Sequence, residues 1–248
     1  MKAIILAAGR GSRMGGATAE RPKCLVELAG RPLLDWQIHA LRQGGIEDIA
    51  IVRGWQAEKL DGRGLKTFDN PRWNSTNMVM SLACAAQWLE AERCIVSYSD
   101  IFYPGAAVRT LAGSPHDLTI AYDPHWAALW SRRFADPLSD AETFRIDGQS
   151  RLESIGSRPA TMEEVQGQYM GLLHFSPAGW AAVASLLAGL PDAERDRLDM
   201  TSLLSRLLAR GEAIHGVPVE GPWGEVDNET DLALYHAMIA AGELPASP

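Results

Sequence analysis

The sequence predicts an α/β fold in which a mostly parallel sheet carries helices on both faces. An apolar run from Ala3 to Leu6 ends in a glycine-rich loop, as a buried strand would. Apolar residues then recur at helical spacing from Pro32 to Arg42. Two more strand-like segments, Asp48 to Gly54 and Cys94 to Asp100, bracket a helical pattern from about Met78 to Ala91. This alternation is typical of parallel strands joined by crossover helices.

The first elements have recognisable ends. Gly9 and Gly11 stop the first strand, and its apolar run is far shorter than the roughly 18 residues that suggest a membrane span. We therefore expect a strand rather than a secretory signal, and a cytoplasmic protein. Pro32 suits the first turn of the following helix, and Gly44-Gly45 suits its end.

The second half of the sequence predicts an irregular segment, here called the excursion, that is inserted within a single domain spanning residues 1–248. Segments 118–123 and 171–176 look like strands, and the chain from 122 to 171 between them is irregular. We expect that segment to be an inserted lid or small subdomain that binds an acceptor substrate. Within it, strands 144–146 and 152–155 can form a hairpin around Asp147-Gly148. Two helices, a strand and a last helix follow, at 177–190, 200–211, 213–221 and 229–241, and Asn228 can cap the last helix.

Charge narrows the choice of ligands. The net charge is −8, which argues against a nucleic-acid partner. The first 31 residues nevertheless carry six lysines and arginines against two glutamates, so the acidic excess lies in the rest of the chain. Three cysteines and six histidines are scattered without metal-ligand spacing. An acidic protein with a cationic, glycine-rich first loop is suited to a small polyanion.

The glycine loop after the first strand can serve several purposes. Its backbone N–H groups can converge on an anion. A dinucleotide fingerprint would need a third glycine where Met14 stands, and the lysine motif of a P-loop is absent. A simple surface turn is a further alternative.

The stretch "LAAGRGSRM", followed by "RPKCLVELAGRPLLDW", resembles the nucleotidyltransferases that activate sugar phosphates and related compounds. The resemblance implies a Rossmann-like nucleotidyltransferase fold whose loop wraps the base and triphosphate of a nucleotide. It implies that Arg13 contacts the phosphates that are expelled and that Lys23 reaches the α-phosphate. The loop residues that match the nucleotide-binding positions are Leu6, Ala7, Ala8, Gly9, Gly11 and Ser12.

Carboxylates near two strand ends predict a metal site. Asp100 ends a strand at the edge where open α/β sheets bind ligands. Glu225 and Asp227, two residues apart in an extended segment, project to the same side. The same resemblance implies that Asp100 and Asp227 hold Mg²⁺, which prefers carboxylate oxygens. The alternative is a turn at Asp100 and a solvated capping cluster at 225–229.

A second segment indicates which nucleotide the protein binds. "NPRWNSTNMVMSLACA" resembles the corresponding stretch of cytidylyltransferases that act on phosphocholine and aminoethylphosphonate. By position, Thr76, Asn77 and Ser81 are candidates for the pyrimidine edge and the start of a helix. Capping of the helix at Met78 is the simpler interpretation, and both can hold.

The excursion supplies candidates for acceptor binding. Trp126, Trp130 and Phe134 share one helical face, as core residues do. Carboxylates lie near them in sequence, and an aromatic face with carboxylates suits an ammonium group. Nearby arginines can meet a phosphate, although Ser157 replaces the glutamate that precedes the phosphate-binding lysine of sugar-specific relatives. The predicted acceptor residues are Trp130, Arg133, Asp140, Glu142, Arg158, Tyr169 and Glu225.

The arrangement "W…RRF.DPL.DAE…GQYMG" resembles enzymes that cytidylylate phosphonates or similar small phosphates. We therefore expect a magnesium-dependent cytidylyltransferase that joins CMP from CTP to a small phosphate or phosphonate and releases pyrophosphate. A uridylyl- or thymidylyltransferase acting on a sugar 1-phosphate is the first alternative, and a non-catalytic nucleotide-binding regulator is the second. We expect a monomer or homodimer with no nucleic-acid or membrane partner.

Overall fold

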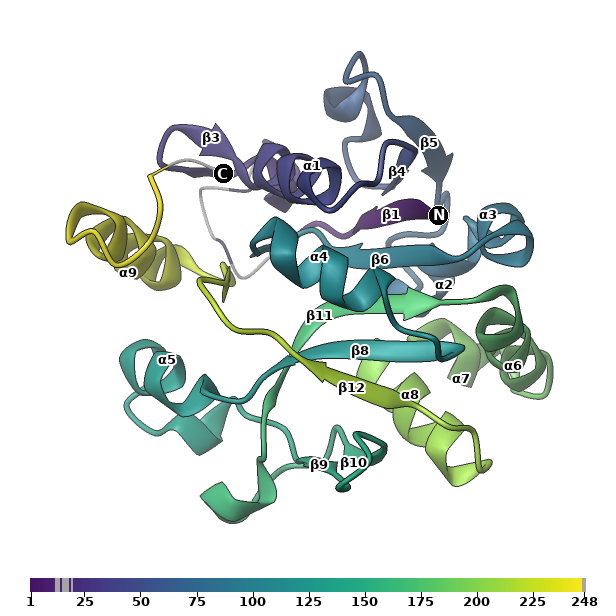
Figure 1. Cartoon of the computed structure of the whole chain (residues 1–248). Coiled ribbons are helices and arrows are strands. Elements are labelled where there is room, and N and C mark those ends of the chain that lie inside the picture. The colour runs from purple at the N-terminus through teal and green to yellow at the C-terminus, as the bar shows by residue number, and fades with distance from the viewer. Residues whose placement is uncertain (12–13, 15–17, 19, 247–248) are drawn as a thin grey trace.

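A computed structural model, which describes residues 1–11, 14, 18 and 20–246, contains a seven-stranded sheet in the order β12-β8-β11-β6-β1-β4-β5 (Figure 1). Neighbouring strands are parallel except that β11 is antiparallel to both β6 and β8. The mostly parallel sheet predicted from the sequence is therefore confirmed. The strands are β1 (Lys2–Ala7), β4 (Ile49–Arg53), β5 (Lys66–Asp69), β6 (Cys94–Tyr98), β8 (Leu118–Asp123), β11 (Gln168–Phe175) and β12 (His215–Pro218).

Helices cover both faces of the sheet, as expected (Figure 1). Side chains alternate along β1, so that Ile4 faces one core and Ile5 the other. The face with Ile4 is covered by α2 (Met78–Ala83), α3 (Ala86–Ala91), α6 (Pro177–Ala188) and α8 (Met200–Ala209). The face with Ile5 is covered by α1 (Leu33–Gln43), α4 (Gly105–Ala112) and α5 (Trp126–Arg133). The two cores hold the sheet between them and leave the carboxyl ends of its parallel strands free to carry a site.

Two expected elements differ in detail. The single helix predicted from 78 to 91 is two short helices, because Cys84 and Ala85 donate to carbonyls three residues back and end α2. Strand β5, helix α4 and helix α7 (Asp192–Arg197) have no counterpart in the sequence predictions. The closing helix α9 (Glu229–Ala240) begins as expected, with the Asn228 side chain accepting from the Asp231 amide.

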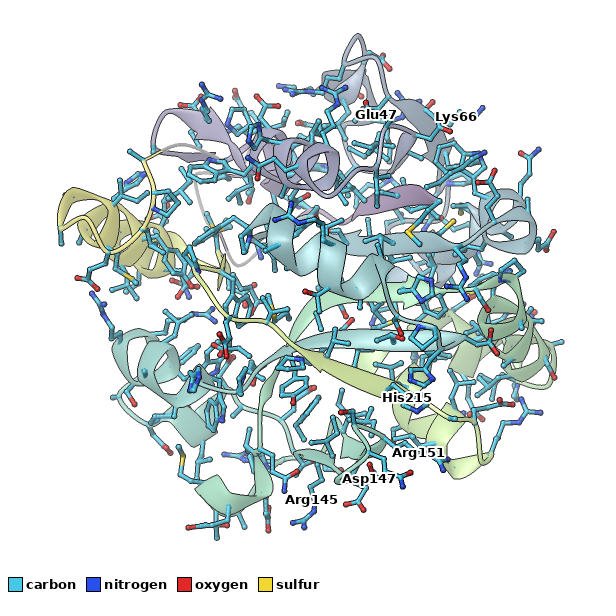
Figure 2. The ribbon with its side chains drawn as sticks, viewed as in Figure 1. Glu47, Lys66, Arg145, Asp147, Arg151 and His215 are labelled. Atoms are coloured by element: carbon cyan, nitrogen blue, oxygen red, sulfur yellow. The ribbon has the colours of Figure 1, made fainter. Side chains whose placement is uncertain are left out.

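The excursion between β8 and β11 packs against the sheet edge. Its hairpin, β9 (Phe144–Ile146) and β10 (Leu152–Ile155), forms as the sequence predicts. The Leu152 amide donates to Ile214, and the Gly216 amide donates to Ser150, so the hairpin extends the edge strand β12. Figure 2 shows Asp147 and Arg151 of the hairpin beside His215 of β12. The role of residues 122–171 as an acceptor-binding insertion stays a prediction.

No helix within the described part of the chain combines the length and apolar character needed to cross a bilayer.

His174 is a buried titratable group within the sheet. It lies on β11 opposite Ile95 and Thr119, its side chain is buried, and its ring nitrogens have no hydrogen-bond partner among the described residues. Burial lowers the pKa of His174 to about 4, and the charge of Arg93 adds to this effect. The folded protein therefore keeps this imidazole neutral at pH values where the unfolded chain protonates it.

We expect the free energy of unfolding to fall as the pH drops below about 6.5, because the His174 imidazole then binds a proton in the unfolded state but not in the folded state. Between pH 7 and pH 5 the loss from His174 should be about 2 kcal/mol. Urea unfolding at both pH values measures it. His174→Leu should remove this part of the pH dependence, whereas the exposed-site control His125→Leu should retain it. Equal pH dependence in the wild type and His174→Leu would contradict this assignment.

Candidate active site

The site forms where distant segments meet at the carboxyl ends of the parallel strands. Asp100 follows β6 directly, and the glycine loop follows β1. A two-residue strand, β13 (Gly224–Glu225), pairs antiparallel with β7 (Ile101–Phe102). The Val226 amide also donates to the Asp100 carbonyl at 2.8 Å. This small ladder brings the late acidic segment against Asp100.

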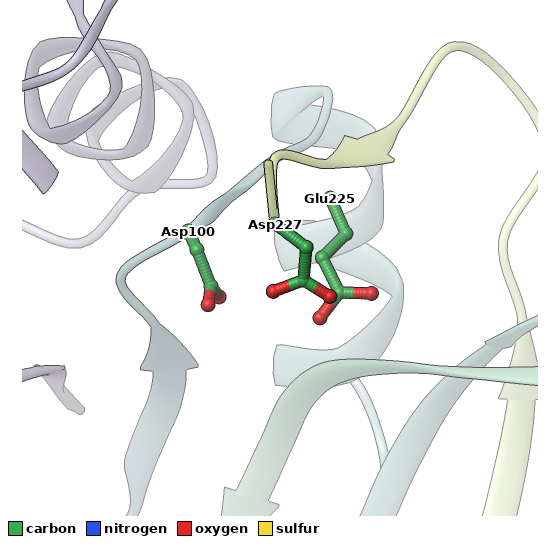
Figure 3. Close-up of side chains that lie close together, drawn as sticks. All are labelled: Asp100, Glu225 and Asp227. Atoms are coloured by element: carbon green, nitrogen blue, oxygen red, sulfur yellow. The ribbon is translucent and has the colours of Figure 1, made fainter. Parts of the chain in front are cut away.

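Asp100, Glu225 and Asp227 form a compact carboxylate cluster. Each offers an oxygen within 4.8 Å of those of the other two, and Figure 3 shows the three side chains close together. The Asp100 Oδ1 atom is buried and accepts no hydrogen bond from the residues that the structure describes. Three hard oxygen donors, one of them buried and unsatisfied, fit a magnesium ion.

Lys23 bridges two of these carboxylates. Its Nζ atom lies 2.7 Å from Asp100 Oδ2 and 2.7 Å from Asp227 Oδ1, and its side chain is buried. Burial by itself would lower the pKa of Lys23, but the two aspartates outweigh it, so the pKa is raised and the ammonium stays charged. The glycine loop lies against its stem: a Cβ on Gly11, where φ is +67°, would come within 2.8 Å of Lys23 Cβ. The loop therefore fits closely over this lysine only with glycine at that position.

Arg133 is a second cation beside the cluster, near the Asp227 oxygen that Lys23 does not contact. Its guanidinium donates two hydrogen bonds to the Asp231 carboxylate at 2.9 and 3.0 Å, and it lies 3.5 Å from Glu225 and 3.8 Å from Asp227. Asp231 also accepts from the Asp227 amide at 2.9 Å. The Trp130 ring lies 4.7 Å from the guanidinium carbon. Arg133, predicted to bind the acceptor, is thus tied to three carboxylates of its own chain.

The carboxylates influence one another's protonation. Burial, followed by the charges of Asp227 and Asp100, raises the pKa of Glu225 to about 8. Without a bound cation, Glu225 therefore holds a proton more readily than an exposed glutamate does. A divalent cation at the cluster would favour its ionised form, because metal binding competes with protons for the same oxygens.

A cavity of about 190 Å³ lies between the glycine loop and the start of α2. It brings together most of the predicted nucleotide residues with Lys23 and Asp100. Ala7 does not line it, because its side chain faces the core behind the sheet. Ser12 and Arg13 lie outside the described residues. The predicted residues that line the cavity are Leu6, Ala8, Gly9, Gly11, Thr76, Asn77 and Ser81.

Polar side chains along this cavity form a connected set. The Asn70 amide donates to Thr76 and to Ser81, each at 3.0 Å. The Asn77 side chain accepts from the Met78 amide, so the capping alternative holds for that residue. Trp73 also lines the cavity and was missed, although its segment carried the resemblance to cytidylyltransferases.

A second cavity, of about 270 Å³, lies on the other side of Tyr98 and Met78, which line both. The pairing of β11 with β8 is irregular between Tyr169 and Leu173, beside this cavity, and Gly171, with φ +73°, leaves room for the Tyr98 ring. Burial first, and then the charges of Asp199 and Asp140, raise the pKa of Glu142. The acidic and tyrosine residues that line the cavity are Tyr98, Asp140, Glu142, Tyr169, Asp199, Glu225 and Asp227.

This cavity contains four of the predicted acceptor residues but not the others. Trp130 is fully buried and packs on Trp126 and Trp223, which is the core packing that its helical spacing allowed. Arg158 is exposed and does not line the cavity. Asp199 was missed because its sequence signal is that of a helix cap: it accepts from the Ser202 amide at the start of α8.

Comparisons with known proteins point to one family. The model for the MobA-like NTP transferase domain matches residues 3–162. A CTP:phosphoglutamine cytidylyltransferase of Campylobacter jejuni is 34% identical, with 94% of this chain and 98% of that protein aligned. A glucose-1-phosphate thymidylyltransferase of Streptomyces griseus is 28% identical, with 96% and 66% aligned. The structure of a CTP:phosphocholine cytidylyltransferase from Streptococcus pneumoniae shares the fold, with TM-score 0.71, 20% identity, and 96% and 98% of the chains covered.

Arg133 and its neighbour Arg132 allow a matched test of the buried cation. We expect Arg133→Leu to lower the free energy of unfolding by about 3–5 kcal/mol, because it leaves buried carboxylates without their partner. Arg132→Leu removes only an exposed pair with Glu243 and should cost at most about 1 kcal/mol. Urea unfolding at pH 7 measures both. Equal losses in the two variants would contradict a special role for Arg133.

Proposed function

The chain belongs to the family of MobA-like NTP transferase domains, and we propose that it is a cytidylyltransferase that joins CMP from CTP to a small, amine-bearing phosphate or phosphonate. The observation that carries the proposal is the placing of Lys23 and the three carboxylates where two cavities meet. One cavity lies under the glycine loop, and the other is lined by acidic side chains. A nucleotidyltransferase needs to bring two substrates together at such a point.

The choice of CTP has two supports. The relative from Campylobacter jejuni, aligned over nearly its whole length, is named for CTP. The cavity under the loop is also lined by the hydroxyl groups of Thr76 and Ser81, which the buried Asn70 amide holds in place, and hydroxyl groups can donate to and accept from a pyrimidine edge.

The charge of the second cavity supports an amine-bearing acceptor. Five carboxylates line it, and none of its described lining residues is a lysine or arginine. An ammonium group would be attracted to this surface, and the Met170, Met200 and Tyr169 side chains can contact an alkyl chain. Phosphocholine, 2-aminoethylphosphonate and phosphoglutamine all carry such a nitrogen.

The three carboxylates fit a magnesium ion by their hard oxygen donors and by the unsatisfied Oδ1 of Asp100. Asp100 and Asp227 would hold it, with Glu225 beside them. Bound there, it would supply positive charge that stabilises the leaving pyrophosphate.

The chain's own groups would position the reaction. A phosphate monoester is largely ionised near neutral pH, since its second pKa is about 6, so no general base is needed. Its oxygen forms a new bond to the α-phosphorus as the bond to the β-phosphate breaks. Lys23 and the loop amides offset the repulsion between the two anions before they react. Catalysis would then consist of positioning and charge stabilisation.

A pyrophosphate-release screen tests this proposal directly. Four nucleoside triphosphates are combined with phosphocholine, 2-aminoethylphosphonate, phosphoglutamine and glucose 1-phosphate. We expect release with CTP and an amine-bearing acceptor. Preference for UTP or dTTP with the sugar phosphate would overturn the proposal, and nucleotide binding without any turnover would favour a regulator.

Asp227→Asn should lower kcat/KM by about a thousandfold or more, because it removes a charged ligand at the reacting phosphates. The matched control is Glu229→Gln, an exposed carboxylate two residues away, which should keep near-normal activity. Steady-state rates, with circular dichroism to confirm folding, measure both. Full activity in Asp227→Asn would contradict its role.

Asp199→Asn separates charge from capping, because asparagine caps a helix as well as aspartate does. We expect the acceptor KM to rise about tenfold, since one attractive charge near the ammonium is lost, and the KM for CTP to stay within about twofold. The exposed control Glu153→Gln should change neither value. Equal increases in both KM values would count against an acceptor role for Asp199.

A further inference from the structure

Lys23 contacts the two carboxylates, Asp100 and Asp227, that would hold a metal ion. Its ammonium contacts one oxygen of each carboxylate at 2.7 Å, and these two residues belong to the cluster whose oxygens lie within 4.8 Å. A divalent cation bridging the same carboxylates would stand beside the ammonium. At about 4 Å, two like charges near a protein surface repel by several kcal/mol, so both cations are not held there together.

The contacts around Lys23 maintain this arrangement. The side chain is 8% exposed, and the Gly11 backbone lies against its stem. Arg133 lies 3.8 Å from the Asp227 oxygen that Lys23 does not contact, and so the cluster has two nearby cations of its own. The described cations therefore compensate a large part of the charge that would otherwise attract free metal.

We propose that Lys23 is a displaceable counter-ion: it keeps free divalent cations from Asp100 and Asp227 until a nucleoside triphosphate draws its ammonium away. A triphosphate bound under the glycine loop offers Lys23 stronger anionic partners, because Lys23 lines that cavity. Metal and nucleotide then bind with positive coupling, each raising the affinity for the other by the same factor. The identity of the nucleotide rests on the proposed function, whereas the exclusion of free metal does not.

Binding of Mn²⁺ to the whole protein without nucleotide tests the proposal. The readout is the electron paramagnetic resonance signal of free Mn²⁺ during titration. We expect Lys23→Met to bind Mn²⁺ at least about tenfold more tightly than the wild type, because the competing charge is gone. Lys23→Arg keeps the charge and should stay close to the wild type. Adding Asp227→Asn to Lys23→Met should abolish the gain in Mn²⁺ affinity, which would show that Mn²⁺ binds at this cluster.

A second measurement needs no variant at Lys23, whose loss could affect folding. In the wild type, the Mn²⁺ affinity should rise at least about tenfold when a saturating, non-hydrolysable CTP analogue is added. Wild-type protein that binds Mn²⁺ as tightly as Lys23→Met, or Mn²⁺ affinity that the analogue leaves unchanged although it binds, would overturn the proposal. If the analogue does not bind, the choice of CTP fails, while the comparison of Lys23→Met with the wild type still decides the role of Lys23.

Discussion

The ion pairs between Lys23 and the aspartates Asp100 and Asp227 hold the site together. Three carboxylates with oxygens within 4.8 Å of one another would repel strongly if they faced only each other. Lys23 from the N-terminal segment and Arg133 from α5 lie near different oxygens of Asp227. The end of β6 and the start of α9 can therefore lie side by side, although more than a hundred residues separate them. Without these cations the two segments would have to move apart or hold additional protons.

The residues of these ion pairs are divided between the two cavities. Lys23 and Asp100 line the cavity under the glycine loop, whereas Glu225 and Asp227 line the acidic one. Tyr98 separates the two and fits there because Gly171 has no side chain. Among the described residues that line the two cavities, the lysine therefore lies toward the cavity under the loop, whereas five carboxylates line the other. A phosphate group that enters through the acidic cavity is attracted by Lys23 where the two cavities meet. A cationic group on the same molecule is attracted by the carboxylates that line the acidic cavity.

Local signals in the sequence were sufficient for much of the fold. The apolar run of β1, the helical spacing of α1 and the Asn228 cap depend on neighbouring residues, and each forms as expected. The break at Cys84–Ala85 is not visible in periodicity, because both residues suit a helix. The site was predicted only in part for a similar reason. The sequence around Asp199 is typical of a helix cap, and that around Trp73 is typical of a turn. Their positions beside the cavities depend on contacts between segments that are distant in the sequence. Ser12 and Arg13 lie outside the residues that the structure describes.

The aromatic stripe of α5 shows how the core and the site depend on each other. Trp130 packs in the core and its ring lies over Arg133, which in turn pairs with Asp231 at the start of α9. Moving the end of α5 would separate this buried pair, at a cost of about 3–5 kcal/mol, and would leave Glu225 and Asp227 without one of their cations. Any closure of the segment 122–171 over a substrate must therefore come from the chain beyond Phe134. The hairpin is held separately, by backbone hydrogen bonds to β12 and by the burial of Phe144, Leu152 and Ile155 in the core on the other face of the sheet.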